Sequence, residues 1–157
     1  MRKASFFLSL SLILTLINCG DELDIPDNPL EGQIDGMEWS YGSANAYRLT
    51  TDGQFRARFL SKLEAVSDPC TRPSPGLTHV KAIFRPALGV SYSVAPQAID
   101  QNQVQVAFEI SASKTLIATS GFMEVYDINN SVLVGYLQAQ LDDGNKVEGA
   151  FQMSLCD

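Results

Sequence analysis

Almost everywhere after residue 30 of this 157-residue chain, apolar side chains recur with a period of two. In one such segment Phe55, Ala57 and Phe59 alternate with two arginines. A period of two is typical of a β-strand with one buried and one solvated face, whereas an amphipathic helix repeats about every 3.6 residues. No segment offers a good amphipathic helix. The sequence therefore predicts an all-β protein.

Turn-forming residues separate the alternating segments, as at Asp35-Gly36, Asp52-Gly53 and Asn129-Asn130. About nine strands are expected, and the last three form a meander joined by short turns. The mixed lengths of the nine strands favour an antiparallel two-sheet β-sandwich, with a closed barrel as the alternative. The predicted strands are 31–34, 37–49, 54–61, 78–84, 90–94, 103–111, 115–127, 132–141 and 146–155.

A short basic and apolar stretch opens the chain. Arg2 and Lys3 precede an apolar run from Phe6 to Ile17. This run is shorter than the roughly 20 residues that a helix needs to cross the hydrocarbon core of a membrane. Its length and its basic start are typical of a secretory signal peptide.

The run ends in Leu16-Ile17-Asn18-Cys19, which resembles a bacterial lipobox, where signal peptidase II cuts before a cysteine that carries diacylglycerol. Leu16 and Ile17 match that pattern, whereas Asn18 differs from the usual Gly, Ala or Ser. The resemblance implies that residues 1–18 are a signal peptide and that Cys19 is the lipid attachment site. The alternative is an ordinary secretory signal cleaved nearby, which would leave Cys19 as a plain thiol.

The segment 19–30 is acidic, contains two prolines and carries no base, so we expect a flexible tether before a single domain at 31–157. The whole chain has a net charge of −7, and removal of the signal peptide makes it more acidic. Because an acidic domain repels phosphate backbones, nucleic acid is not an expected partner.

Several short motifs are similar to those of uncharacterised bacterial envelope lipoproteins that have a single β-sandwich domain. They are EGQIDGMEW at 31–39, the DPC loop at 68–70, RPALGVSYSV at 85–94 and the ending at 135–156. The resemblance implies a fold and a location but no activity. The expected location is the bacterial cell envelope, lipid-anchored to a membrane, with the outer membrane favoured and the periplasmic or surface face left open.

Two cysteines remain beside Cys19, and an oxidising envelope favours a disulfide between Cys70 and Cys156. Cys70 lies in a Pro-rich loop at 62–77, and the position of Cys156 in its strand places the sulfur on the solvated side. The bond would therefore strap the loop to the outside of the sheet. The strapped loop, which includes Arg72, is a candidate contact surface because rigidity lowers the entropy cost of binding.

No constellation of catalytic residues emerges. His79, the one histidine, is expected on the solvated face of its strand, and no nucleophile motif accompanies it. Glu109, Glu124 and Glu148 could pair to hydrolyse a glycoside, but each also fits the wet face of a strand. Residues 142–145 fit a hairpin turn better than a calcium loop. We therefore predict no enzymatic activity, no metal and no cofactor.

Aromatic residues are the remaining candidates. Trp39 is expected in the core. Phe122 and Tyr126 share a strand face with Glu124. If that face is exposed, the two rings could stack on sugars or on a partner protein. If it is covered, they belong to the core, and we favour the core.

Together these features predict a monomeric, lipid-anchored envelope protein that acts as a binding or structural module. Its partners would be the membrane, through the anchor, and a protein or carbohydrate. Two alternatives stay open. A small-ligand carrier requires a barrel with an apolar cavity, and a carboxylate-dependent hydrolase requires two acids that face each other in a cleft.

Overall fold

The computed structural model describes residues 26–49, 53–64, 70, 78–97 and 100–156. Several of the expected features fall wholly or largely outside these residues. They are the signal peptide at 1–18, the lipid-attachment residue Cys19, most of the acidic tether, and most of the loop at 62–77 with Arg72.

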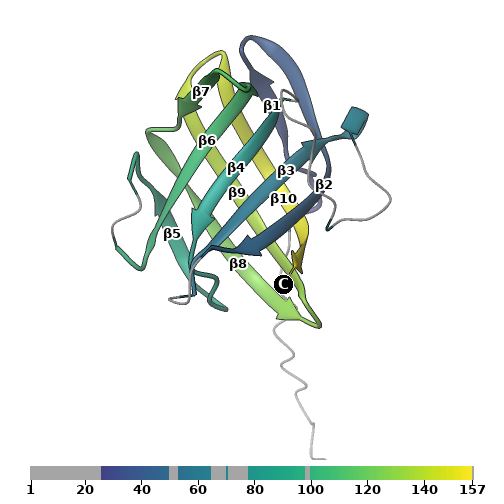
Figure 1. Ribbon diagram of the computed structural model, residues 1–157, viewed down its shortest axis with the longest axis vertical. Coiled ribbons are helices and arrows are strands. Elements are labelled where there is room, and N and C mark those ends of the chain that lie inside the picture. Colours follow the sequence, from purple (N-terminus) through teal and green to yellow (C-terminus); the bar gives the residue numbers. More distant parts are fainter. Residues whose placement is uncertain (1–25, 50–52, 65–69, 71–77, 98–99, 157) are drawn as a thin grey trace, which may run out of the picture.

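Ten β-strands and one short 3₁₀ helix form within the described residues (Figure 1). The strands alternate buried and accessible side chains as the sequence pattern predicts. The elements are β1 (Glu31–Ile34), β2 (Met37–Arg48), β3 (Phe55–Ser61), η1 (Lys62–Glu64), β4 (His79–Phe84), β5 (Ser91–Val94), β6 (Gln103–Ser111), β7 (Lys114–Ile117), β8 (Ser120–Asn129), β9 (Val132–Asp142) and β10 (Asn145–Cys156).

The strands form a closed barrel, so the expected two-sheet sandwich is wrong and the barrel alternative is confirmed. The order β4-β3-β2-β1-β10-β9-β8-β5-β6 returns to its start because β6 also pairs with β4. The tenth strand, β7, pairs only with β6. In Figure 1, β6, β4 and β3 cross in front of β9 and β10. Closure gives strand edges a partner that two separate sheets would leave exposed.

The predicted strand 115–127 is in fact two strands. Its first part, β7, pairs with β6, and its second part, β8, pairs with β9 and β5. Between them the N–H of Ala118 donates to Val106 and the N–H of Thr119 donates to Gln140. The chain thus passes from one wall of the barrel to the other at this point. The predicted C-terminal meander is confirmed as β8, β9 and β10.

Large side chains fill the barrel interior. The rings of Phe59 and Phe151 meet edge to face with centroids 5.0 Å apart. Trp39 is 5% exposed and belongs to the core, as predicted. Gly135 is required beside Phe151, because a Cβ atom there would lie 2.8 Å from the Phe151 ring and 2.3 Å from the carbonyl oxygen of Glu124. The interior is therefore a packed core.

Candidate binding face

The outer face of β8, β9, β10 and β1 carries a row of aligned side chains. The strand register places Phe122 opposite Gln138, Gln138 opposite Glu148, and Glu148 opposite Glu31. Strands lie about 4.8 Å apart, so this row of four side chains spans roughly 14 Å across the strands. It is a continuous polar and aromatic surface.

A neighbouring row adds two tyrosines that hydrogen-bond to glutamates. Glu124 lies opposite Tyr136. The hydroxyl of Tyr126 donates to Glu124 Oε2 at 3.0 Å, and that of Tyr136 donates to Glu148 Oε1 at 2.8 Å. The Phe122 and Tyr136 rings stack, with centroids 5.8 Å apart and planes 19° apart. We call this surface the tyrosine–glutamate face, made up of Glu31, Phe122, Glu124, Tyr126, Tyr136, Gln138 and Glu148.

The tyrosine hydroxyls of this face hold their protons. Burial, followed by the hydrogen bond and the charge of Glu124 and by the nearby Tyr136, raises the pKa of Tyr126 to about 12. Burial and the hydrogen bond to Glu148 also raise the pKa of Tyr136. Because a neutral tyrosine donates its one proton, it fixes one carboxylate oxygen and leaves the second able to accept from a ligand.

A groove of about 520 Å³ continues the tyrosine–glutamate face. Its floor includes Glu31 and Glu148, two like charges directly opposite each other on neighbouring strands. Such a pair destabilises a sheet unless something bridges it. The lining also contains the amide groups of Asn28, Gln33 and Gln140, the ammonium group of Lys146 and the carboxylate of Asp143. This donor and acceptor set suits a ligand with several hydroxyl groups.

Phe122 and Tyr126 lie on the outer face and are half-buried, so the favoured core assignment is wrong. Alternation along β8 points Met123 and Val125 into the barrel and Phe122 and Glu124 outward. The described strands form a single closed sheet, so no second layer packs on this outer face.

The opposite wall of the barrel differs. His79 shares the outward face of β4 with Lys81, as predicted, but it is 6% exposed rather than solvated. Its Nε2 lies 2.9 Å from Glu109 Oε2, and Lys81 Nζ contacts the other oxygen of the same carboxylate. We call the outer face of β2, β3, β4 and β6 the covered wall, because its outward-facing Asn45, Leu60 and Ala107 are also buried.

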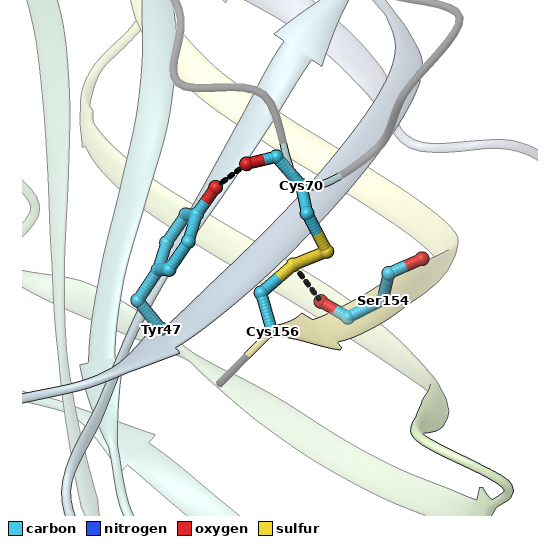
Figure 2. Close-up of a disulfide and its surroundings, with 4 residues drawn as sticks. All are labelled: Tyr47, Cys70, Ser154 and Cys156. Carbon is cyan, nitrogen blue, oxygen red and sulfur yellow. Dashed lines mark hydrogen bonds between the residues drawn. A yellow bond between two sulfur atoms is a disulfide. The ribbon is translucent and has the colours of Figure 1, made fainter.

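Cys70 and Cys156 are joined on the outside of the barrel, with Cα atoms 5.8 Å apart (Figure 2). This separation meets the geometric requirement for a disulfide. The Cys70 carbonyl also accepts a hydrogen bond from the Tyr47 hydroxyl. Cys156 pairs with Tyr47 at the end of β10. Cys70 is thus bonded to the covered wall, on the outer side that the strand pattern predicts.

The structure does not bring the three candidate glutamates together. Glu109 lies on the covered wall among cations, whereas Glu124 and Glu148 lie on the tyrosine–glutamate face with β9 between their strands. Asp142 Oδ1 accepts from the Gly144 N–H and the Asn145 side chain, as in the predicted hairpin turn.

Sequence reasoning missed two contributors to the face, Glu31 and Gln138. Glu31 opened a predicted strand and Gln138 lay on a predicted wet face, but neither was connected to the aromatic residues. The short turns before β9 and β10 fix the strand register, and this register is the signal that could have aligned these residues with the aromatic side chains.

Among the residues that the structure describes, no group of metal-binding side chains occurs. In the same part of the chain, no helix is long and apolar enough to cross a membrane. Comparison with protein-family models, curated proteins and solved structures finds no significant match to this chain.

Proposed function

We propose that this protein is a lipid-anchored envelope protein whose tyrosine–glutamate face binds carbohydrate. The observation that carries the proposal is the row of Phe122, Gln138, Glu148 and Glu31, with the Tyr136 ring stacked on Phe122. An aromatic surface beside aligned carboxylate and amide groups is suited to a molecule with apolar C–H faces and many hydroxyls.

The chemical groups of a saccharide match those of the tyrosine–glutamate face. A sugar ring can lay its C–H face on Phe122 or Tyr136, and its hydroxyls can donate to the second oxygens of Glu124 and Glu148. Hydrogen bonds to a charged acceptor are about twice as strong as those between neutral groups. The acidic groups would repel phosphorylated or carboxylated glycans, so a neutral or amine-bearing saccharide fits best.

Both alternatives fit this arrangement less well. A carrier needs an enclosed apolar cavity, but Phe59 and Phe151 meet in the middle of this barrel. A glycosidase needs an acid and a base on opposite sides of one bond. Glu31 and Glu148 instead stand side by side on one sheet face and project in the same direction.

A glycan screen followed by titration calorimetry tests the binding proposal. We expect Phe122→Ala to weaken binding of the selected saccharide by roughly tenfold, because it removes the ring that stacks on Tyr136. Thr115→Ala is the control, since Thr115 is exposed on β7 and lies opposite Glu109 of β6, on the other side of the barrel. Equal affinities for the two variants, or no binding of neutral or amine-bearing glycans, would contradict the proposal.

Membrane fractionation tests the anchor separately. The Leu16-Ile17-Asn18-Cys19 motif leads us to expect that Cys19→Ala releases the protein from the membrane fraction. A Cys19→Ala variant that stays with membranes after a carbonate wash would refute lipid anchoring and leave the binding proposal untouched.

A further inference from the structure

The β1–β2 hairpin projects beyond its neighbour on one side. Residues 37–40 of β2 pair with β1, but β3 begins to pair with β2 only at Tyr41. The chain leaves β3 at Ser61 and turns into η1, which Figure 1 shows at the end of β3 beside β2. Among the described residues, no strand pairs with the other edge of Met37–Ser40.

The hairpin geometry shows which backbone groups face that edge. Asp35 and Gly36 form a two-residue turn with φ values of 55° and 75°, so Ile34 and Met37 are a hydrogen-bonded pair. Bonded pairs alternate along an antiparallel ladder, and the Tyr41 N–H donating to Leu30 continues the same series. The N–H and C=O groups of Glu38 and Ser40 therefore point away from β1.

A groove of about 280 Å³ runs along this edge, between β2, η1 and Thr78. Two apolar side chains at its rim are unusually exposed, Met37 at 62% and Leu63 at 98%. One polar atom at its lining, Trp39 Nε1, is buried and has no hydrogen-bond partner among the described residues. A buried polar atom without a partner costs free energy until it finds one.

We propose that the Met37–Ser40 edge of β2 binds an extended peptide strand in which apolar and basic side chains alternate. Added strands bond through their backbones, and the unpaired groups of Glu38 and Ser40 supply that ladder. Four residues of edge correspond to roughly 14 Å, so a segment of about four or five residues would cover it.

The alternation follows from the two faces of β2. Met37 and Trp39 lie on the core side, so every second side chain of the added strand would pack on them and on Leu63. The groove lining contains one cation, Lys62, and two acids, Glu38 and Glu64. Because Glu38 is the charged side chain on the other side of β2 itself, the intervening side chains of the added strand would be basic. A second copy of this acidic chain would place Glu38 near Glu38, which disfavours self-association through this edge.

The single tryptophan provides a direct readout, since Trp39 lines the groove. We expect the peptide acetyl-Val-Lys-Val-Lys-Val-amide to change its fluorescence saturably. A peptide N-methylated at all of its backbone amides should fail, because it cannot donate to the ladder in either strand orientation. A result in which both peptides bind alike, or neither binds, would overturn the proposal.

A charge reversal distinguishes the site from general attraction. Glu38→Lys should weaken binding of the lysine peptide by about fivefold to tenfold and favour acetyl-Val-Glu-Val-Glu-Val-amide. Asp100→Lys makes the same charge change between β5 and β6, away from the groove, and should leave both affinities unchanged. Equal effects of the two variants would overturn the proposal, as would a wild-type dimer that Glu38→Lys dissociates, because a second copy would then occupy the edge.

Discussion

The covered wall and the tyrosine–glutamate face lie on opposite sides of one barrel, and they treat their acidic residues differently. On the covered wall, Glu109 contacts both His79 and Lys81. On the tyrosine–glutamate face, Glu124 and Glu148 accept hydrogen bonds from neutral tyrosine hydroxyls, and Glu148 lies opposite a further acid, Glu31. Cations neutralise the acid of the covered wall, whereas the acids of the tyrosine–glutamate face keep their charge.

This difference indicates where stability and recognition reside. Charges that are partly buried and paired stabilise the fold, and breaking one pair leaves its partners uncompensated. Unneutralised, half-buried acids beside stacked rings contribute little to stability but can bind a ligand. We therefore expect substitutions on the covered wall to lower the free energy of unfolding, and those on the tyrosine–glutamate face to lower affinity.

The largest expected effect is loss of the disulfide from the covered wall. Replacing Cys70 and Cys156 together by alanine opens a link between residues 86 apart in sequence. The chain-entropy account gives a loss of about 4 kcal/mol in the free energy of unfolding. Urea denaturation measures it, and saccharide affinity should stay at the wild-type value. Free thiols at both positions in envelope-purified protein, seen by mass spectrometry of unreduced peptides, would refute the bond.

The next largest effect is expected from Glu109→Gln, which should lower the free energy of unfolding by about 1–2 kcal/mol. The loss is smaller than for a fully buried ion pair because the Glu109 side chain is 25% exposed. Burial alone raises the pKa of Glu109, but the hydrogen bond and charge of Lys81, with the charges of His79 and Arg58, outweigh it and hold the pKa below its usual range. The matched control is Glu124→Gln, the same change on the opposite face.

The pH dependence follows from the direction of that shift. A carboxyl whose pKa is lower in the folded state stabilises the fold above its unfolded pKa of about 4.3, and this contribution is lost as the pH falls through the lower folded value. Wild-type protein should therefore lose stability in acid more steeply than Glu109→Gln. Parallel stability curves for the two proteins in acid would contradict this account of the covered wall.

Much of the fold could be predicted because period-two alternation is a local signal. The strands of the meander and the outward position of Cys156 follow from counting along one strand. Barrel closure could not be predicted in this way, because it depends on β6 pairing with β4, and nothing local to either strand specifies that partner.

The candidate site was mispredicted because exposure depends on what packs on a strand face. Alternation shows that Phe122 and Tyr126 share the face of Glu124, but only barrel closure shows that no second sheet of the described strands covers it. The sequence pattern places His79 on the correct face of β4 but predicts a solvated side chain, whereas the side chain is buried. Its burial depends on contacts that alternation along one strand does not specify. Alternation predicts the direction of a side chain but not its exposure.

A smaller effect is expected from Tyr136→Phe on the tyrosine–glutamate face. The change removes the hydrogen bond to Glu148 and keeps the ring that stacks on Phe122. We expect about 0.5 kcal/mol of lost stability and a clear loss of saccharide affinity, because Glu148 is no longer fixed. Thermal unfolding and calorimetry measure the two quantities. Unchanged affinity would show that Tyr136 does not position the Glu148 carboxylate for the saccharide.

The smallest effect at neutral pH is expected from Glu124→Gln, which nevertheless tests the electrostatics of the face directly. Burial, then the hydrogen bond and charge of Glu124, and then Tyr136, raise the pKa of Tyr126 to about 12. The substitution removes the Glu124 charge, so the pKa of Tyr126 should fall toward the ordinary tyrosine value of about 10. The difference in tyrosinate absorbance between proteins with and without Tyr126→Phe isolates this group.

The raised pKa of Tyr126 also determines the direction in which stability changes with pH. A tyrosine whose pKa is raised in the folded state contributes fully below its unfolded pKa of about 10. That contribution is lost as the pH rises toward the folded value of about 12. Glu124→Gln should reduce the stability that is lost as the pH rises from about 10 to about 12. It should leave stability near pH 7 unchanged within about 0.5 kcal/mol. If Tyr126 titrates at the ordinary value in the wild type, its hydroxyl does not donate to Glu124, and the contrast between a neutralised wall and a charged face loses its basis.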